Sequence, residues 1–199
     1  NHAGASQVDL SAGIVLNGVT GIHTVKNTLV YNVNNTNGIT STFGNNVIQN
    51  VTIVCLGAGT SVWGFRTQYD SPVLKNVVVA GYATDYQGTA GTCANNATDL
   101  GSFGGTNYGT SGQVNVVKAT EWENTTSGTE DFRIKSGSAK LALNGTASGT
   151  PSTDIVGQTR SGSAPTIGAW ELLVITPIIV SSGNLGLTFS VPTRLVNTH

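Results

Sequence analysis

Three segments of this sequence share one pattern: residues 25–30 read VKNTLV, residues 48–53 read IQNVTI, and residues 74–79 read LKNVVV. Each segment has an apolar residue, a polar residue, an asparagine and then residues that favour β-strands. The asparagines are Asn27, Asn50 and Asn76, which lie 23 and then 26 residues apart. Gly38 and Gly64 each precede an apolar residue and stand 12 residues before Asn50 and Asn76. Two features therefore recur with one phase, which indicates a true internal repeat.

The period of this repeat determines the kind of fold. A period of about 20 to 30 residues without helical periodicity predicts a coil of short strands in which each turn of chain stacks on the previous one. Equivalent strands of successive turns then pair in parallel, and inward side chains such as Leu29, Val51 and Val77 are expected to form rows. The sequence thus predicts an all-β solenoid, a parallel β-helix.

The repeated asparagine has a structural explanation. Asparagine tolerates the left-handed backbone of a tight turn, and stacked asparagine amides can hydrogen-bond to one another. We therefore interpret Asn27, Asn50 and Asn76 as a structural ladder at one corner of the coil. The alternative is that asparagine is simply common in this chain.

Composition excludes several classes of function. Only 10% of the 199 residues are charged and the net charge is -1, so binding to nucleic acid or to an anionic membrane is not expected. The apolar stretch at residues 172–180 contains Thr176 and Pro177, which argues against membrane insertion. Abundant Gly, Asn, Thr and Ser are typical of extracellular or virion proteins. Because the chain begins with Asn1, we expect it to be a matured piece, with more turns of the coil before it.

The rest of the chain divides into segments of different character. After the repeats, residues from about 83–125 form a polar stretch that is rich in glycine and threonine, so we expect a surface excursion outside the core. Residues of about 131–171 are expected to close the solenoid, giving a β-helix that spans residues 1–171. Residues 172–199 are expected to form a short β appendage, because the alternation of Leu185, Leu187, Phe189 and Val191 creates an apolar face. Such a face needs a partner, so we interpret this appendage as an oligomerisation segment.

Three motifs in the closing region carry a family resemblance. Residues 131–139 read DFRIKSGSA, residues 154–160 read DIVGQTR, and residues 167–171 read IGAWE. Their order and spacing resemble the ending of right-handed parallel β-helix proteins with the pectate-lyase-like fold, of the kind found in phage fibres and tailspikes and in surface proteins of environmental bacteria. The resemblance implies a right-handed coil, closing rungs and a short β appendage. Lys140 and Val156 depart from the usual pattern.

The closing motifs also have a direct physical interpretation as a cap. Asp154 and Arg160 flank a glycine turn and could pair across it, and Trp170 supplies a large apolar lid for the open end of the coil. A catalytic role for Asp154, Arg160 or Glu171 is the alternative, but closure of the solenoid accounts for all three.

We assign no catalytic residues, no metal site and no cofactor from the sequence. Asp70, Asp85 and Asp99 are the carboxylates to consider for polysaccharide cleavage, but they lie on turns or in the excursion and form no recurring pair. Cys55 and Cys93 are too few for a zinc site. They either form a disulfide, if the excursion folds back, or remain two thiols.

The functional expectation follows from the fold and from aromatic residues in turns. Tyr69, Tyr82 and Tyr86 could stack on sugar rings. We expect a structural or adhesive virion appendage, such as a fibre, spike or tail-associated protein, on the virion surface or in the extracellular space. Its expected partners are further copies of itself, with a homotrimer favoured, other virion proteins and host-surface polysaccharide. The alternatives are a secreted polysaccharide lyase or glycoside hydrolase, and a bacterial surface adhesin.

Overall fold

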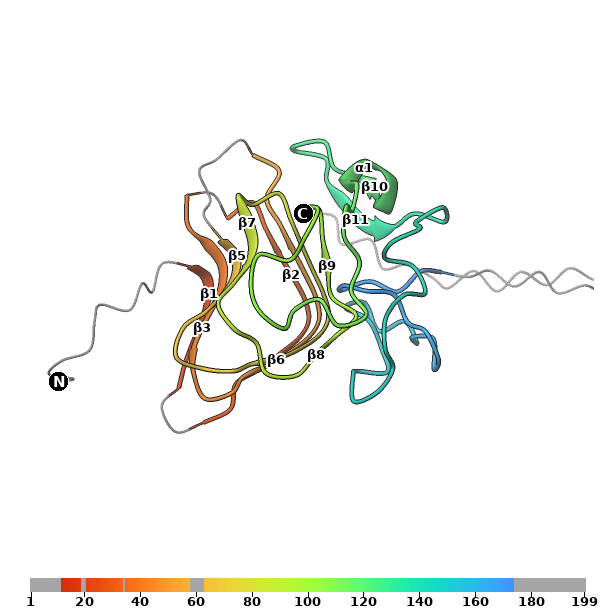
Figure 1. Ribbon diagram of the computed structural model, residues 1–199. Helices are drawn as coiled ribbons and strands as arrows, with labels where there is room; N and C mark the ends of the chain where they lie inside the picture. The colour runs from red at the N-terminus through yellow and green to blue at the C-terminus, as the bar shows by residue number, and fades with distance from the viewer. Residues whose placement is uncertain (1–11, 19–20, 34, 58–62, 174–199) are drawn as a thin grey trace, which may run out of the picture.

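Two parallel β-sheets dominate the computed structural model, which describes residues 12–18, 21–33, 35–57 and 63–173 (Figure 1). Consecutive strands alternate between the two sheets. The first sheet contains, in spatial order, β1 (Ala12–Asn17), β3 (Asn37–Phe43), β5 (Trp63–Thr67) and β7 (Thr84–Gln87). The second contains β2 (Thr24–Tyr31), β4 (Val47–Val54), β6 (Val73–Ala80) and β8 (Cys93–Ala94), and β9 (Ala97–Thr98) also pairs with β6. The all-β prediction with parallel sheets is confirmed, and the arrangement is compatible with a β-helix-like fold.

We call each pair of successive strands, one from each sheet, a rung. The repeated segments lie in β2, β4 and β6, which pair in the register that the sequence pattern predicts: Lys26 is opposite Gln49, and Gln49 is opposite Lys75. Ile39 of β3 is likewise opposite Phe65 of β5. The two features that recur in the sequence therefore stack on equivalent positions of successive rungs.

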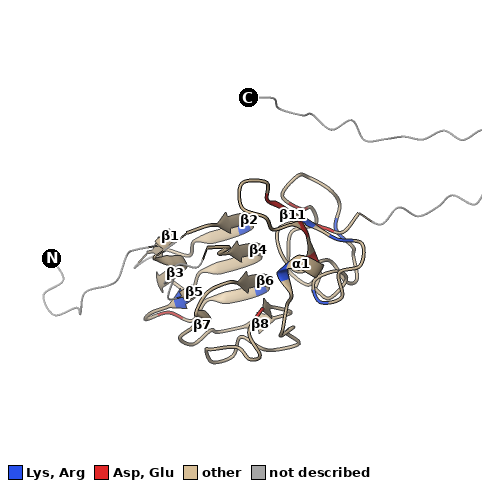
Figure 2. Ribbon diagram, turned by 90° about the horizontal axis from the view of Figure 1, so that it is seen from above, with Lys and Arg blue, Asp and Glu red and all other residues tan. Residues whose placement is uncertain are grey.

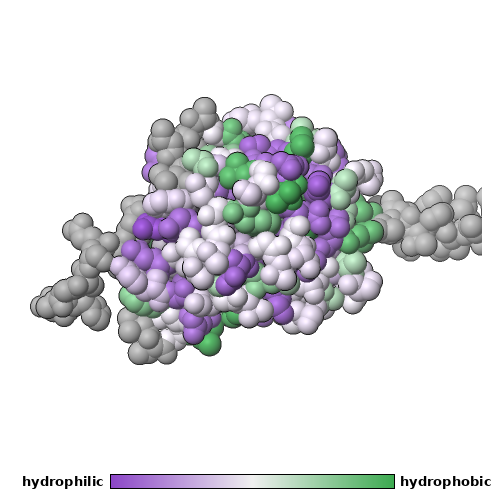
Figure 3. All heavy atoms as spheres, in the orientation of Figure 1, coloured by the Kyte–Doolittle hydropathy of each residue, from purple (hydrophilic) through white to green (hydrophobic). Residues whose placement is uncertain are grey.

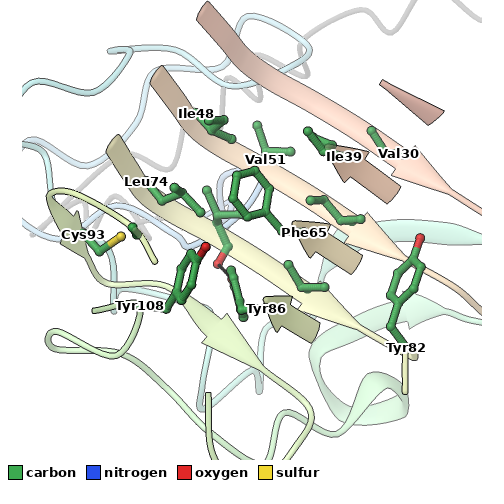
Figure 4. Close-up of a cluster of buried hydrophobic side chains, with 14 of the residues drawn as sticks. Val30, Ile39, Ile48, Val51, Phe65, Leu74, Tyr82, Tyr86, Cys93 and Tyr108 are labelled. Carbon is green, nitrogen blue, oxygen red and sulfur yellow. Dashed lines mark hydrogen bonds between the residues drawn. The ribbon is translucent and has the colours of Figure 1, made fainter. Parts of the chain in front are cut away.

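The interior core fills the space between the two sheets. Ile39 and Phe65 of the first sheet meet Ile48, Val51 and Val77 of the second, and all five side chains are fully buried (Figure 4). Residues at equivalent positions of successive rungs form what we call a file. Because each rung adds one residue to each file, the core consists of stacked rows of side chains.

The second sheet is covered on both faces. Val78 and Ala80 of β6 point away from the interior core and pack instead against Trp122, Phe132 and Ile167 of the later chain. We call this second cluster the flank core. Leu29 belongs to it, so the expectation that Leu29 lines the interior is wrong: it pairs in register with Thr52, one position beyond Val51. Burial on both faces explains the nearly continuous apolar run of β6.

The flank is built by residues 118–173, which lie beside the second sheet (Figures 1 and 2). It begins with the one-turn helix α1 (Lys118–Glu121) and continues through an antiparallel pair, β10 (Trp122–Asn124) and β11 (Asp131–Ile134). Turns and loops form the remainder. Many of the charged positions of the described chain lie in this flank (Figure 2).

The surface excursion predicted for residues from about 83 to 125 differs from the structure: β7, β8 and β9 belong to the two sheets, and residues 99–117 follow them. Tyr108 is fully buried in the interior core, and Phe103 packs against the same cluster. Thr89 pairs with Thr106, and Ala97 pairs with Gln113, both in parallel. This segment therefore continues the stack beyond the last rung and covers its end. The prediction failed because it rested on the scarcity of apolar residues, whereas a few aromatic residues are enough to close a narrow core.

The appendage predicted for residues 172–199 lies outside the described residues from position 174 onward. In the part of the chain that the structure describes, no helix is long and apolar enough to cross a membrane. Polar and weakly polar residues cover most of the face shown in Figure 3, with small hydrophobic areas between them.

Candidate functional site

The asparagine file connects the stack of rungs to the flank. Asn27, Asn50 and Asn76 all adopt left-handed backbone, with φ of 46°, 53° and 56°. Asn76 Nδ2 donates to Asn50 Oδ1 over 2.8 Å, which is the contact expected of a ladder. Asn76 also donates to Thr146 O and accepts from Thr146 N, each over 2.8 Å. Asn27 Nδ2 donates to Thr153 O over 2.8 Å. The file thus holds flank loops as well as neighbouring rungs.

Asn95 is a fourth member that sequence reasoning missed. It follows Ala94, which pairs with Lys75, so Asn95 stands in the same file as Asn76. It has φ of 54°, and its Nδ2 donates to Asn144 O over 2.8 Å. The spacing from Asn76 to Asn95 is shorter than the earlier intervals, which hid the repeat. The available signal was the sequence TCAN at residues 92–95, in which Cys93 and Ala94 precede the asparagine.

Arg160 organises the flank. Its guanidinium donates to the carbonyl oxygens of Thr153, Thr166, Gly168 and Ala169 over 2.8–3.2 Å. Arg160 Nη1 also pairs with Glu171 Oε2 at 3.3 Å, and both side chains are almost fully buried. Burial lowers the pKa of Arg160, an effect that the charges of Glu171 and Asp154 oppose.

Two expectations about the cap need correction. Arg160 forms its ion pair with Glu171 and not with Asp154, whose Oδ1 accepts the N–H groups of Val156 and Gln158 within its own turn. Trp170 packs against the flank core, so it lies along the second sheet and does not cover an end of the stack. The closing motifs thus form a lateral cover, because the outer face of the second sheet is itself apolar and must be buried.

The three candidate tyrosines have different environments. Tyr82 is 4% exposed and Tyr86 is fully buried, and both belong to the interior core (Figure 4). Tyr86 OH donates to Val77 O over 2.7 Å. The expectation that these two bind glycans is therefore wrong. Only Tyr69, with 60% of its surface exposed, remains accessible among the three.

Tyr69 lies on a turn with left-handed backbone, at φ of 66°. Its ring stacks on Phe43 of the previous rung, with centroids 5.7 Å apart and an interplanar angle of 14°. Beside it, Asp70 Oδ2 accepts hydrogen bonds from Ser41 Oγ and Asn46 Nδ2. Burial raises the pKa of Asp70, and these two donors oppose that shift. The turn therefore presents an exposed aromatic surface held by polar groups of the neighbouring rung.

Asp85 and Asp99, which the sequence pattern did not identify as a pair, lie side by side. Asp85 is fully buried, and its Oδ2 accepts from Thr98 Oγ1 over 2.5 Å and from Asp99 N over 3.2 Å. Asp99 Oδ2 accepts from Gly81 N over 2.9 Å and lies 3.4 Å from Lys118 Nζ. Burial and the neighbouring charge of Asp99 raise the pKa of Asp85 to about 8.

Cys55 and Cys93 are both buried thiols that are not bonded to each other. Cys93 stands in register with Leu74, and Leu74 with Ile48. Cys55 lies seven residues farther along than Ile48, a separation of about 20 Å along a strand. A disulfide between Cys55 and Cys93 is therefore geometrically excluded. Burial raises the pKa of Cys93 to about 11.

Within the described ranges, no three His, Cys, Asp or Glu side chains gather into a group able to hold a metal ion. Comparisons of the chain with models of known protein families, with curated proteins and with solved structures find no match. The case for function therefore rests on the geometry of this chain.

Proposed function

We propose that this chain belongs to a right-handed parallel β-helix protein that serves as a structural or adhesive appendage of a virion. The observation that carries the proposal is the in-register stacking of β2, β4 and β6, with a buried core on each face of their sheet. Paired backbone, rows of apolar side chains and the asparagine file give a stiff scaffold whose turns face outward. A rigid scaffold with exposed turns is suited to attachment to a surface and not to turnover of a substrate.

The turn at Tyr69 is the proposed contact for host-surface glycans. The exposed ring and its stacked partner Phe43 offer an apolar face of the kind that packs on pyranose rings. Asn45, an exposed residue whose Oδ1 accepts the Ser71 N–H, adds a hydrogen-bonding group beside this ring. This assignment places the protein on the virion surface or outside the cell, with copies of itself and other virion proteins as partners.

Binding to purified capsular polysaccharides tests this assignment. Tyr69→Ala is expected to lower affinity about fivefold, because stacking contributes roughly 1 kcal/mol. Tyr31→Ala is the matched control, since Tyr31 is 49% exposed but contacts Phe132 on the flank. Equal affinities of the two variants would contradict a glycan site at Tyr69. A bacterial surface adhesin would bind through the same turn and would be distinguished by its presence on cells and not on virions.

The second candidate is a polysaccharide lyase or glycoside hydrolase, which the Asp85–Asp99 pair favours. Glycoside hydrolases commonly use two catalytic carboxyl groups, but these normally lie about 5 to 10 Å apart on either side of the substrate. Asp85 is fully buried, and its Oδ2 accepts hydrogen bonds from Thr98 and from the Asp99 backbone N–H. Release of new reducing or unsaturated ends from the polysaccharide, abolished in Asp85→Asn, would favour the enzyme over the appendage.

A further inference from the structure

The last rung replaces a glycine by an aspartate. Gly13, Gly38 and Gly64 precede the paired residues Ile14, Ile39 and Phe65, so they form one file. A Cβ at Gly64 would lie 2.0 Å from Val79 Cγ1, and one at Gly38 would lie 2.4 Å from Ile53 Cγ2.

The next position of this file is Asp85, just before Tyr86, and the position opposite Val79 in the next rung is Thr98. An apolar approach of the two sheets is thus replaced at the end of the stack by the hydrogen bond from Thr98 to Asp85.

In each carboxyl of the pair, the two oxygen atoms differ in the hydrogen bonds that they accept. Asp85 Oδ2 accepts from Thr98 Oγ1 and Asp99 N, and Asp99 Oδ2 accepts from Gly81 N and forms an ion pair with Lys118 Nζ. The Oδ1 atoms of both carboxyls are buried, and among the described residues no donor reaches either of them. Asp99, whose N–H binds Asp85 Oδ2, brings a second carboxyl beside one that is fully buried. An ionised carboxylate is costly where a buried oxygen has no donor and another carboxyl lies nearby, so this geometry favours a proton on one of the two.

We propose that Asp85 and Asp99 share one proton and act as a pH-sensitive latch that fixes residues 99–118 over the end of the stack. The pair lies where these parts of the chain meet: Asp85 on β7, Thr98 on β9, Gly81 after β6, and Lys118 at the start of the flank. With the proton present, the carboxyls attract each other. Without it, two negative charges face each other in a buried position, and the segment is released.

The neighbouring groups favour Asp85 as the carrier of the proton. Among the described residues, Lys118 is the cation that contacts the pair, and it lies on Asp99, which leaves Asp85 without a cation. Tyr82 and Tyr86 face Asp85, and burial raises the pKa of each above its ordinary value, so both stay neutral. Cys55 faces Tyr82, and Cys93, whose pKa is also raised by burial, faces Tyr86. The pKa of Asp85, about 8, accords with this assignment.

The direction of the pH effect follows from proton linkage. A released, solvated Asp85 has an ordinary pKa of about 4, whereas the latched form holds its proton up to about pH 8. Between these values the latched form binds one more proton, so the opening equilibrium rises about tenfold per pH unit and then levels off. The latch is therefore tight under acidic conditions and loosens as pH rises toward 8.

Amide hydrogen exchange of the full chain tests the latch at the Gly81 and Val116 amides, which donate to Asp99 Oδ2 and Thr98 O. Asp85→Asn replaces the protonated carboxyl by a neutral amide that can still donate to Asp99. At each pH the exchange rate of the native chain is divided by that of the variant. This ratio is expected to rise about tenfold per unit from pH 5 to 7 and to level off near pH 8.

Two controls accompany this measurement. Asp70→Asn removes another carboxyl whose Oδ1 is buried without a donor among the described residues, and it should reproduce native exchange at Gly81 and Val116. The Cys55 amide, which donates to Ala80 O within the stack, should give a ratio that is independent of pH.

A ratio at Gly81 and Val116 that does not change with pH would overturn the proposal. Carbon-13 titration of aspartate carboxyls in the native chain gives a second test that needs no variant: one carboxyl titrating near pH 8 supports the latch, and all titrating below pH 5 rejects it. Calcium chloride is the remaining probe. If calcium stabilises the native chain but not Asp85→Asn, the pair holds a cation and not a proton, and the latch is rejected.

Discussion

Arg160 shows how a single buried charge can organise a region with little regular secondary structure. Its donors reach four carbonyl oxygens from two separate loops, and its charge is balanced by buried Glu171. Because a charge in this position is tolerated only when every partner is in place, the loops can adopt one arrangement relative to the second sheet.

We expect Arg160→Ala to lower the free energy of unfolding by about 3–5 kcal/mol, since it leaves Glu171 buried and without its cation. Urea unfolding followed by circular dichroism measures this loss. Arg133→Ala is the control, because Arg133 pairs with Asp131 at a side chain that is 50% exposed, and the loss there should stay below about 1 kcal/mol. Similar losses for the two variants would show that the Arg160 network contributes little.

At the scale of single residues, structure could be predicted where the residue type favours a particular backbone conformation. The left-handed backbone of the asparagines followed from turn chemistry, whereas the ion-pair partner of Arg160 did not follow from the closing motifs. Tyr82 and Tyr86 were misjudged because position near a turn was equated with exposure, although the narrow interior needs large side chains at its end. The Asp85–Asp99 pair was missed because it forms across rungs of unequal length; the glycine file that ends in Asp85 was its signal.

The elements that sequence predicts best are those of the second sheet. β2, β4 and β6 carry both the asparagine and long β-favouring runs, so their stacking could be read from the repeat. The strands of the first sheet are signalled only by a glycine followed by an apolar residue. β8 and β9 are two residues each, too short to show any periodicity. The lateral position of the flank was not predictable, because it depends on the outer face of β6.

Gly64 of β5 tests how closely the two sheets approach. We expect Gly64→Ala to destabilise the chain by about 1–3 kcal/mol, because the new Cβ would lie 2.0 Å from Val79 Cγ1 and 2.9 Å from Tyr82 Cδ2. Gly137→Ala, where a Cβ would meet nothing within 4 Å, should change stability by less than about 0.5 kcal/mol. Thermal unfolding of both variants provides the comparison, and an unchanged Gly64→Ala would mean that the sheets separate easily.

The whole molecule is proposed to function as an assembly of identical chains. Light scattering should therefore give the mass of a trimer for the full chain. Removal of residues 174–199, which contain the apolar alternation from Leu185 to Val191, should give a monomer with unchanged circular dichroism. A monomeric full chain, or a trimer that survives the truncation, would contradict the role assigned to this segment.

The two-sided burial of β6 also constrains the order in which the molecule can form. Asn76 bonds to Thr146, 70 residues later, and Asn27 bonds to Thr153, 126 residues later. On the ribosome, the two strands that carry these asparagines emerge well before the loops that cover them, and contacts of such separation form late. A nascent chain that stops before residue 116 would leave Val54, Val78 and Ala80 without the later residues that cover them. Prematurely terminated products should therefore aggregate, and chaperone binding should concentrate on this stage of synthesis.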